Sequence, residues 1–310
     1  MPQNGLFLRE QLEIISNEVI TQEFPELLIA SGAILPVTNQ LDYRAETFSW
    51  RYMTAVGEAK ILSNGGQDVP LVSAYVQKKM GVIRTLVDGY EITLEDLEAA
   101  QFAGMNISAE MAIVARTVME ETIDRLGYTG STEDNLLGFL NLPNVVNDTV
   151  LNDGNSNGGT NATQWQFKTA DQIYRDITTF LTRARQATKS IEKPKVLLIP
   201  QAQFDRISEL VFPANTDGTL LEFILKTQRA TPSGLQDIVP VEQLAGAGVG
   251  GTDVMIAYQK DPKKIRFEVP LDFEQRPPEQ VTFSTKVVCR SRLAGVILMK
   301  PMSLRTATGI

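Results

Sequence analysis

The clearest pattern near the start of the chain is an alternation of apolar and polar residues that predicts a β-hairpin. Phe48, Trp50 and Tyr52 alternate with polar residues in the stretch 47–54, as in a half-buried strand. A second strand-rich stretch, 71–87, comes after a turn signal at 64–66, and neither of its sides is uniformly apolar. An isolated two-stranded hairpin is marginally stable in water. We therefore expect this hairpin to lie on another surface, such as that of a second subunit.

Helical spacing predicts that the longest element of the chain begins near residue 108. A short helix capped by Thr93 ends near Gly104, and Ser108 then caps a helix that is roughly 30 Å long at 1.5 Å per residue. The apolar stripe of the long helix is expected at Met111, Ala115, Val118, Thr122 and Leu126. Its carboxylates are expected largely on other faces, at Glu110, Glu120, Glu121 and Asp124. Gly127 stands where a glycine commonly ends a helix.

The remainder of the chain predicts a mixed α/β layer and then a series of strands. Helices are predicted from the capping box at 169–172 onward, at 201–211 and at 219–225. Strands are predicted at 196–199, 254–258, 264–269, 281–289 and 295–299. The Asn- and Gly-rich stretch 144–164 has no apolar periodicity and is predicted to be an exposed loop or a domain junction. The order of elements indicates that the end of the chain returns to pack on the long helix.

The two ends of the chain carry opposite charge. Residues 1–50 contain 2 basic and 7 acidic groups, a net charge of −5, whereas residues 260–310 contain 10 basic and 5 acidic groups, a net charge of +5. Attraction between the ends, within a subunit or between neighbours, and two unrelated solvated surfaces explain this pattern equally well. A helix is predicted over 6–23. Pro25 and Gly32 interrupt the residues after this helix, so the start of the chain is expected to be an extended arm.

Composition removes several classes of function. The chain has 310 residues, of which 43% are hydrophobic and 21% charged, as in an ordinary folded protein. It contains no histidine, which excludes Ser-His-Asp and Cys-His catalysis and histidine-bound metals. The single cysteine, Cys289, lies in an apolar stretch and is interpreted as a small buried side chain. A net charge of −8 opposes tight binding of nucleic acid. The sequence has neither a secretory leader nor a run of about 18 apolar residues, which favours a cytoplasmic protein.

A glycine-rich motif, Gly246-Ala247-Gly248-Val249-Gly250-Gly251, suggests a phosphate-binding loop. A dinucleotide-binding loop comes after a strand and opens a helix. Here the next predicted element is a strand, so a flexible loop is the better interpretation. Carboxylates that are neighbours in sequence, such as those at 95–96 and 120–121, point apart on a helix. The pairs at 171 and 176 and at 42 and 46 lack calcium-loop spacing and are interpreted as solvated faces. We assign no catalytic, cofactor-binding or metal-binding residue.

Three stretches carry a resemblance to a known family. Gly89-Tyr90-Glu91-Ile92-Thr93 precedes the short and the long helix, and Gly127-Tyr128-Thr129-Gly130 leads to Leu137-Gly138-Phe139-Leu140-Asn141. The tail contains Arg292-Leu293-Ala294-Gly295-Val296, Lys300-Pro301 and Gly309-Ile310. In the order of these segments the chain resembles, over almost its whole length, the major capsid proteins of tailed bacteriophages that have the Hong Kong 97-like fold.

The resemblance implies an α+β fold with four parts. An N-terminal arm would cover 1–35, and an extended β-hairpin loop, 50–85, would lie over a neighbouring subunit. A peripheral domain would combine 36–49, 86–145 and 258–310 around a long spine helix, Ser108–Leu126. An α/β axial domain, 146–257, would meet its neighbours around five-fold and six-fold axes.

The resemblance also implies self-assembly in place of catalysis. The chain would form the hexamers and pentamers of an icosahedral shell around double-stranded DNA that is held without sequence specificity, in a virion assembled in the host cytoplasm. Portal, scaffolding and decoration proteins are the implied partners. Since the arm begins almost at Met1, scaffolding is expected to be separate, absent or already removed. Inter-subunit contacts are expected at Trp50, Tyr52, Lys60, Tyr75, Lys78, Lys79, Gly246, Gly248 and Gly250. Some family members form a Lys–Asn crosslink between subunits, but no partner residue is fixed here and none is assigned.

Two alternatives stay open from the sequence. An encapsulin, a cellular compartment of the same fold that encloses a cargo enzyme, is barely separated from a phage capsid by these residues. A nucleotide-binding cytoplasmic enzyme that uses 246–251 is the alternative from another class. A shell protein is expected to form particles tens of nanometres across, and deletion of 55–80 is expected to leave a folded subunit that does not assemble.

Overall fold

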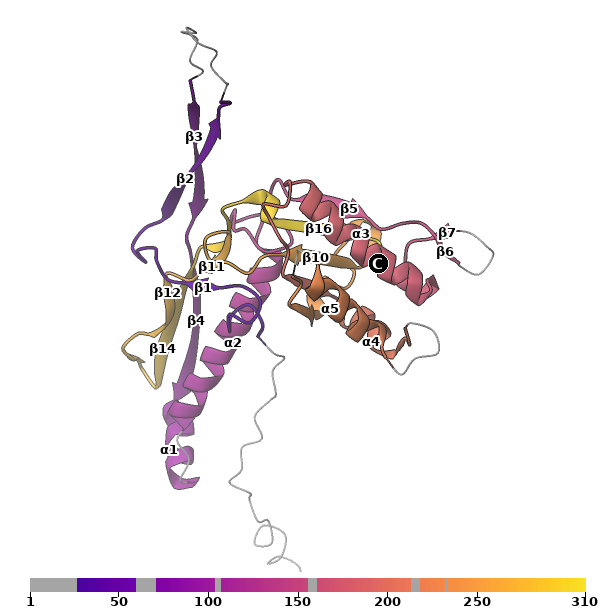
Figure 1. Cartoon of the computed structure of the whole chain (residues 1–310). Helices are drawn as coiled ribbons and strands as arrows, with labels where there is room; N and C mark the ends of the chain where they lie inside the picture. The colour runs from indigo at the N-terminus through magenta and orange to yellow at the C-terminus, as the bar shows by residue number, and fades with distance from the viewer. Residues whose placement is uncertain (1–26, 60–70, 104–106, 156–160, 213–217, 232–233) are drawn as a thin grey trace, which may run out of the picture.

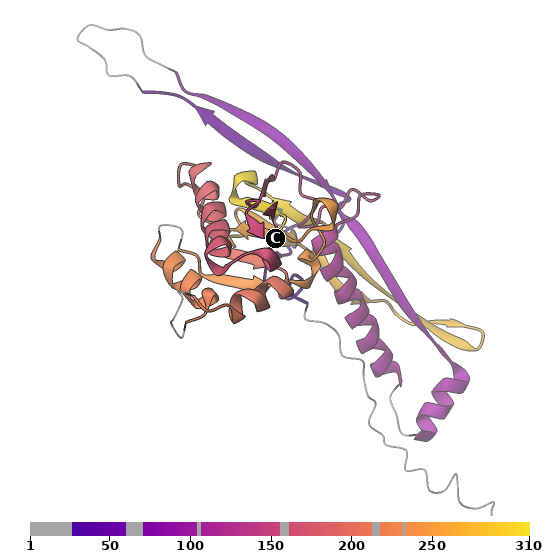
Figure 2. The ribbon, with the colours of Figure 1, turned by 90° about the vertical axis from the view of Figure 1, so that its right-hand side faces the viewer.

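A long helix and an even longer pair of strands give the molecule one elongated lobe, and a sheet covered by helices forms a second lobe beside it (Figure 1). The structure is a computed structural model that describes residues 27–59, 71–103, 107–155, 161–212, 218–231 and 234–310. The helix predicted over 6–23 lies outside the described residues. Seen from the side, the hairpin β2–β3 and helix α1 lie at opposite ends of the elongated lobe (Figure 2).

Helices and strands share the chain as the sequence predicts for an α+β fold. The helices are α1 (Leu94–Ala103), α2 (Ile107–Thr129), α3 (Ala170–Gln186), α4 (Gln201–Glu209) and α5 (Leu220–Ala230). The strands up to the second lobe are β1 (Val37–Thr38), β2 (Thr47–Val56), β3 (Ser73–Val82) and β4 (Arg84–Thr93). The middle strands are β5 (Val146–Thr149), β6 (Gly154–Asn155), β7 (Asn161–Ala162), β8 (Val196–Ile199), β9 (Asp237–Pro240) and β10 (Val254–Tyr258). The last are β11 (Ile265–Glu268), β12 (Leu271–Gln275), β13 (Glu279–Val281), β14 (Ser284–Leu293), β15 (Gly295–Leu298) and β16 (Leu304–Thr308).

The spine helix α2 packs on β4 and β14 through a stripe that partly matches the predicted one, since Ala115 is buried and Met111 and Leu126 pack against the same core. Its buried hydrophobic side chains are those of Ala115, Met119, Ile123 and Tyr128, while Val118 is exposed. Asp124, which the sequence pattern places away from the apolar stripe, is buried, with 3% of its surface exposed. Its Oδ1 accepts hydrogen bonds from the backbone N–H groups of Ile29, at 2.7 Å, and of residue 30, at 2.9 Å. A charged residue can therefore replace an apolar one on the buried face because it satisfies two donors.

The end of α2 corrects the prediction that Gly127 is its capping residue. Gly127 lies inside the helix, where an added Cβ would come within 2.8 Å of the Ile29 side chain. The residue after the helix is Gly130, whose φ of +66° belongs to the left-handed region that glycine adopts easily. The carbonyls of residues 127 and 128, left without partners at the helix end, accept the N–H groups of Phe139 and Leu140 at 2.7 and 2.9 Å.

Residues 27–35 are part of the core and not of a projecting arm, which shortens the arm predicted over 1–35. Ile29, Ile34 and Leu35 are at most 1% exposed. Tyr258 Oη donates to the carbonyl of residue 34 at 2.7 Å. The backbone N–H groups of Ile29 and residue 30 also donate to the Asp124 carboxyl of the spine helix. Burial raises the pKa of this carboxyl, and the two hydrogen bonds partly offset the rise. The segment is thus fixed to the spine helix at one end and to the second lobe at the other.

The start and the end of the described chain lie together, but acidic side chains of the start do not bind basic side chains of the end in the described part. β1 pairs in parallel with β11, which pairs with β15. The Lys260 ammonium donates to the carbonyls of residues 32 and 33, and Arg266 donates to Gln40 at 2.7 Å. Glu268 accepts from Thr38 Oγ1 at 2.5 Å. Hydrogen bonds to polar and backbone groups therefore hold these segments together.

The five-stranded sheet of the second lobe, in the order β5-β16-β10-β8-β9, is buried on both faces. Alternate side chains of β8 and β10 pack into two different hydrophobic cores. Leu198 and Ile256 face the elongated lobe, whereas Leu197 and Met255 face helices α3 to α5. This explains why both strands are uninterrupted apolar runs. β16, which the domain prediction places with the peripheral part, lies between β5 and β10, so the boundary at residue 258 does not separate the two lobes cleanly.

The predictions for residues 144–164 and 281–289 are corrected in part by the observed strands and turns. The stretch 144–164 contains the short strands β5 to β7 in addition to loops. The strand predicted over 281–289 is divided by a turn at Thr282, whose φ is +46°, so β14 begins at Ser284 and runs to Leu293. β14 pairs along its whole length with β4. Cys289 is buried in this sheet, as predicted, and burial raises the pKa of its thiol.

Replacing Asp124 by alanine leaves two backbone N–H groups, one buried and one partly buried, without their acceptor. We expect Asp124→Ala to lower the free energy of unfolding by about 2–4 kcal/mol, and Asp124→Asn, which keeps an acceptor, to lower it less. Urea unfolding of the dilute subunit, followed by tryptophan fluorescence, measures both changes. Glu121→Ala, at an exposed position of the same helix, is the control and should change stability by less than about 0.5 kcal/mol. Equal midpoints for Asp124→Ala and Glu121→Ala would contradict this account.

Candidate assembly surfaces

The hairpin β2–β3 presents two different faces, because residues that pair across its strands share a face. One face carries Phe48, Trp50 and Tyr52 from β2, together with Tyr75 and Lys79 from β3. The other face is formed by Ser49, Arg51 and Met53 of β2 with Val76, Lys78 and Met80 of β3. The alternation read from the sequence is therefore confirmed.

The base of the aromatic face is half-buried and its outer part is exposed. The rings of Phe48 and Trp50 stack at 5.5 Å with an interplanar angle of 18°, and Phe48 lies over Gly81. Cavities of about 200 and 250 Å³ separate this base from the body at Leu137. Trp50 Nε1 is buried and has no hydrogen-bond partner among the described residues, although an indole N–H usually finds one. Tyr75, farther out, is 63% exposed.

The second face exposes apolar side chains that the sequence prediction does not single out. Met53, Val76 and Met80 are 66%, 58% and 66% exposed. An exposed methionine-rich strip is typical of a surface that binds another protein. The sequence contains the signal, since the register of two strands places these residues together once the pairing is known. Of the other predicted contact residues in this region, Lys78 is exposed, Lys79 is half-buried, and Lys60 lies outside the described residues.

The glycine-rich loop lies in the second lobe and is separate from the hairpin, so the structure does not bring the two sets of predicted contact residues together. Gly246 donates its N–H to Asp253 Oδ1 at 2.9 Å, and Gly248 donates to the carbonyl of residue 252 at 2.7 Å. Gly250, at φ +74°, forms an exposed turn before β10. These N–H groups donate to acceptors inside the loop. A 3-10 turn at Val249–Gly251 and then strand β10 come next, so no α-helix starts from the loop as it does in a phosphate-binding loop.

A buried ion pair holds the loop that carries β6 and β7 to helix α3. The Lys168 and Asp176 side chains are fully buried, with Nζ and Oδ2 at 2.6 Å. Lys168 also reaches the carbonyl of residue 151 at 2.5 Å and Asp153 Oδ1 at 3.1 Å. Trp165 Nε1 donates to the same Asp176 oxygen at 3.2 Å. The interpretation of Asp176 as solvated is wrong, because a lysine eight residues earlier folds back to it.

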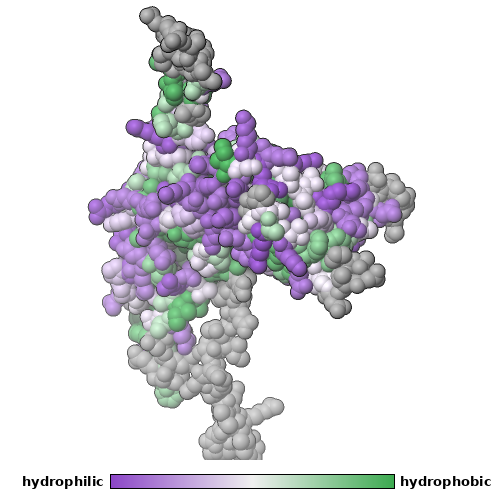
Figure 3. Space-filling model, in the orientation of Figure 1, coloured by the Kyte–Doolittle hydropathy of each residue, from purple (hydrophilic) through white to green (hydrophobic). Residues whose placement is uncertain are grey.

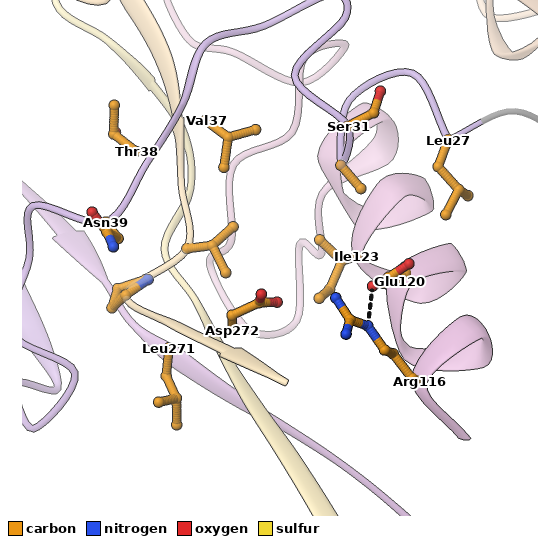
Figure 4. Close-up of a pocket in the computed structure, with 13 residues that line it drawn as sticks. Leu27, Ser31, Val37, Thr38, Asn39, Arg116, Glu120, Ile123, Leu271 and Asp272 are labelled. Atoms are coloured by element: carbon orange, nitrogen blue, oxygen red, sulfur yellow. Dashed lines mark hydrogen bonds and ion pairs between the residues drawn. The ribbon is translucent and has the colours of Figure 1, made fainter. Parts of the chain in front are cut away.

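The largest cavity among those described, of about 710 Å³, opens between α2, the first described residues and the start of β12 (Figure 4). Leu27, Val37, Ile123 and Leu271 give it apolar walls. Arg116 and Glu120 stand on one side, with Nε and Oε1 at 2.7 Å, and Asp272 stands opposite (Figure 4). Because Arg116 and Glu120 are already paired, the cavity has no free pair of groups for acid–base chemistry. It is a space between packed elements beside the point where the N-terminal segment enters the core.

A second exposed apolar region, which the sequence prediction also misses, lies at the far end of the elongated lobe. A groove of about 430 Å³ there is lined by α1, the end of β4 and the β13–β14 turn. We call it the distal groove. Its apolar lining consists of Ile92, Leu94, Leu97, Pro278, Phe283 and Val287. Phe283 is 75% exposed. Figure 3 shows apolar side chains both on the hairpin and toward this end of the lobe.

Neither a membrane span nor a cluster of metal ligands is found among the described residues. Within them, no helix is long and apolar enough to cross a membrane. Across the same ranges, no group of three or more Cys, Asp or Glu side chains is placed to hold a metal ion. What the described surface does offer is a ribbon and a groove that both expose apolar side chains.

Solved structures share this fold over most of their length. The chain is similar to a subunit in the capsid of Myoviridae phage XM1, with a TM-score of 0.78, 19% identity and 99% and 100% of the two chains covered. It is also similar to a chain from a structure of Gordonia phage Cozz, with a TM-score of 0.61, 12% identity and 96% and 91% covered. A virus-like particle from Pyrococcus furiosus has a TM-score of 0.55, 12% identity and 88% and 89% covered. The fold is therefore the Hong Kong 97-like fold of shell subunits.

The sequence itself gives the family. The profile of the family described as Major capsid protein matches residues 57–310. The sequence matches none of the curated protein sequences. The chain therefore belongs to the major capsid protein family, whose members are structural subunits and not enzymes, and the predicted fold class and role are confirmed.

The buried Lys168–Asp176 pair gives a stability prediction for the second lobe. We expect Lys168→Met to lower the free energy of unfolding by about 3–5 kcal/mol, because it leaves the Asp176 carboxylate buried without a cation. Replacing both residues, Lys168→Met with Asp176→Leu, should recover most of this loss. Urea unfolding measures the three free energies, with Lys226→Met on the exposed face of α5 as the control. A single variant as stable as the double one would refute the pair's role.

Proposed function

We propose that the chain forms the hexamers and pentamers of an icosahedral shell that encloses the double-stranded DNA of a tailed bacteriophage. Portal, scaffolding and decoration proteins are its proposed partners, and assembly is proposed to take place in the host cytoplasm. The observation that supports this most strongly is the hairpin, which exposes the apolar side chains of Met53, Val76 and Met80. Such side chains need a surface that only another subunit supplies.

The contacts between subunits are proposed to use the hairpin in one lobe and the loops of the other. Trp50, Tyr52, Tyr75, Lys78 and Lys79 lie on the hairpin, in agreement with a contact role. Gly246, Gly248 and Gly250 lie in an exposed loop of the α/β lobe, which corresponds to the proposed axial domain. A subunit with several different contact surfaces can build a closed shell in which many modest contacts act together.

The encapsulin alternative is less well supported than the phage capsid. The family match and the higher TM-score with the phage XM1 capsid, compared with the particle from Pyrococcus furiosus, favour the capsid. Packaged nucleic acid and an enclosed protein cargo are the observations that separate the two. The negative net charge of −8 suits a shell that encloses DNA without gripping its phosphates.

The purified chain should assemble without any other protein when its concentration is raised. We expect dynamic light scattering to report particles tens of nanometres across, with a fraction that increases with concentration, because many weak contacts form together. Electron microscopy of the same sample distinguishes closed shells from amorphous aggregates. A chain that stays monomeric at the highest soluble concentration, with or without co-expressed phage assembly proteins, would overturn the proposed function.

A shortened hairpin tests whether the ribbon serves assembly or folding. Replacing residues 52–77 by an Asn-Gly turn removes the exposed part and keeps the base, where Phe48 and Trp50 stack. We expect the variant to fold with nearly the stability of the full chain but to form no particles. Circular dichroism, urea unfolding and light scattering measure these properties. Loss of the folded state would contradict the assignment of this segment to assembly.

A further inference from the structure

Three loops at one end of the five-stranded sheet carry an excess of positive charge. They are residues 187–195, 259–264 and 299–303, which connect α3 to β8, β10 to β11 and β15 to β16. Together they contain seven lysines, two carboxylates and no arginine, a net charge of +5. Since the whole chain carries −8, all its other residues together carry −13. A basic surface therefore stands on an otherwise acidic chain, and we call these three loops the basic edge.

Backbone hydrogen bonds hold the three loops of the basic edge side by side. Lys195 donates its N–H to the carbonyl of residue 258 at 2.9 Å, immediately before the second loop. Met299 donates to the carbonyl of residue 264 at 2.8 Å, and Gln259 donates to the carbonyl of residue 303 at 3.3 Å. Lysines that lie far apart in the sequence therefore share one surface.

The two carboxylates of the basic edge are already engaged within it. Glu192 is buried, its Oε2 accepts a hydrogen bond from Lys264 Nζ, and its Oε1 lies 3.7 Å from Lys300 Nζ. Oδ1 of Asp261 accepts the backbone N–H of Lys263 at 2.9 Å. Glu192 thus ties the second and third loops to the first, and the exposed charge of the basic edge is mainly positive.

Four ammonium groups of the basic edge have no hydrogen bond or ion pair among the described residues. The side chains of Lys189, Lys193 and Lys263 are exposed, and that of Lys195 is half-buried. Lys189 and Ser190 have φ values of +51° and +64°, in the left-handed region where glycine is the usual residue after a helix. The chain therefore has a lysine at a position that glycine would occupy with less strain, and such strain is typical of functional positions.

The composition of the basic edge separates a nucleic-acid partner from a protein partner. Interfaces between proteins are enriched in arginine and aromatic residues and depleted in lysine. The three loops contain neither arginine nor an aromatic residue. A lysine ammonium is a hydrated point charge, which suits contacts to phosphate oxygens that need no fixed geometry. A polyphosphate backbone fits this surface better than the acidic surface of a protein.

We infer that the basic edge contacts the phosphate backbone of double-stranded DNA without reading its sequence. The inference rests on the proposed shell function and specifies which surface of the subunit meets the enclosed DNA. Each phosphate that a lysine neutralises releases counterions, so the contact is favourable at low salt and weakens as salt rises. The negative charge on the other residues of the chain repels DNA and confines the contact to this edge. A local and weak contact agrees with DNA that is enclosed but not gripped.

Removal of three exposed lysines from the full-length chain tests this contact. Fluorescence anisotropy of a labelled duplex of about 20 base pairs measures the affinity of the dilute chain at several salt concentrations. We expect Lys189→Gln with Lys193→Gln and Lys263→Gln to weaken binding at least about tenfold near 50 mM salt. The slope of log Kd against log salt concentration should fall by about 2 to 3, because three phosphate contacts are lost. Two duplexes of unrelated sequence should give the same values.

A second triple variant controls for net charge. Lys226→Gln with Arg276→Gln and Lys286→Gln removes the same charge from exposed positions outside the basic edge. It should change the affinity for DNA by less than about threefold, because these side chains do not reach the bound phosphates. Circular dichroism checks that both variants are folded, as substitutions of exposed side chains should leave them.

The outcomes distinguish this inference from the function on which it rests. A wild-type chain without affinity for DNA at low salt, or two triple variants of equal affinity, overturns the DNA contact, while particle formation leaves the shell function standing. Loss of particles with unchanged affinity for DNA would assign the basic edge to a contact between subunits. Tighter binding of poly-L-glutamate than of the duplex, at equal charge concentration, would assign it to an acidic protein; either result refutes the inference. If the wild-type chain forms no particles under any condition, the proposed function itself fails, whatever its affinity for DNA.

Discussion

A two-stranded hairpin has two faces and no interior, so its apolar side chains can be buried only against another surface. β2 and β3 are held together by ladder hydrogen bonds, but each side chain on them can be covered only by something outside the ribbon. Near the body, the stacked rings of Phe48 and Trp50 find partial cover. Farther out, methionine, valine and tyrosine side chains remain more than half exposed. A monomer in this state carries surface whose burial becomes available only on association.

The body of the subunit is organised to hold that ribbon at a fixed angle. β3 continues almost directly into β4, and β4 is paired over its ten residues with β14. The spine helix supports this pair from one side, and its own end is closed by the turn that includes Phe139 and Leu140. Asp124 adds the N-terminal segment to the same helix through two hydrogen bonds. Rigid support of the hairpin favours binding, because a mobile hairpin would lose more conformational entropy when it binds another subunit.

Features that depend on neighbouring residues in the sequence are predicted well, whereas features that depend on contacts between distant segments are predicted poorly. The alternation around Trp50, the capping box at 169–172 and the buried strands β8 and β10 arise from periodicity and local chemistry, and the structure has each of them. Periodicity places Asp124 and Asp176 in solvent, because a carboxylate in a helix is usually exposed. Their burial depends on donors that pattern does not indicate, in one case 95 residues away. β16 likewise joins a sheet whose other strands lie far from it in the sequence.

The same limit applies to the assembly surfaces, and it explains why the sequence indicates the aromatic residues and not the methionines. Aromatic residues stand out in any strand, whereas Met53, Val76 and Met80 are recognised as one surface only when the register places them on the same face of the hairpin. Residues at the distal groove come from separate segments of the chain, so periodicity cannot unite them. A contact between exposed side chains of two subunits is weak in isolation, since even an exposed ion pair contributes at most about 1 kcal/mol. Weak contacts allow a misplaced subunit to dissociate before the shell closes, and closure then makes the many contacts act as one.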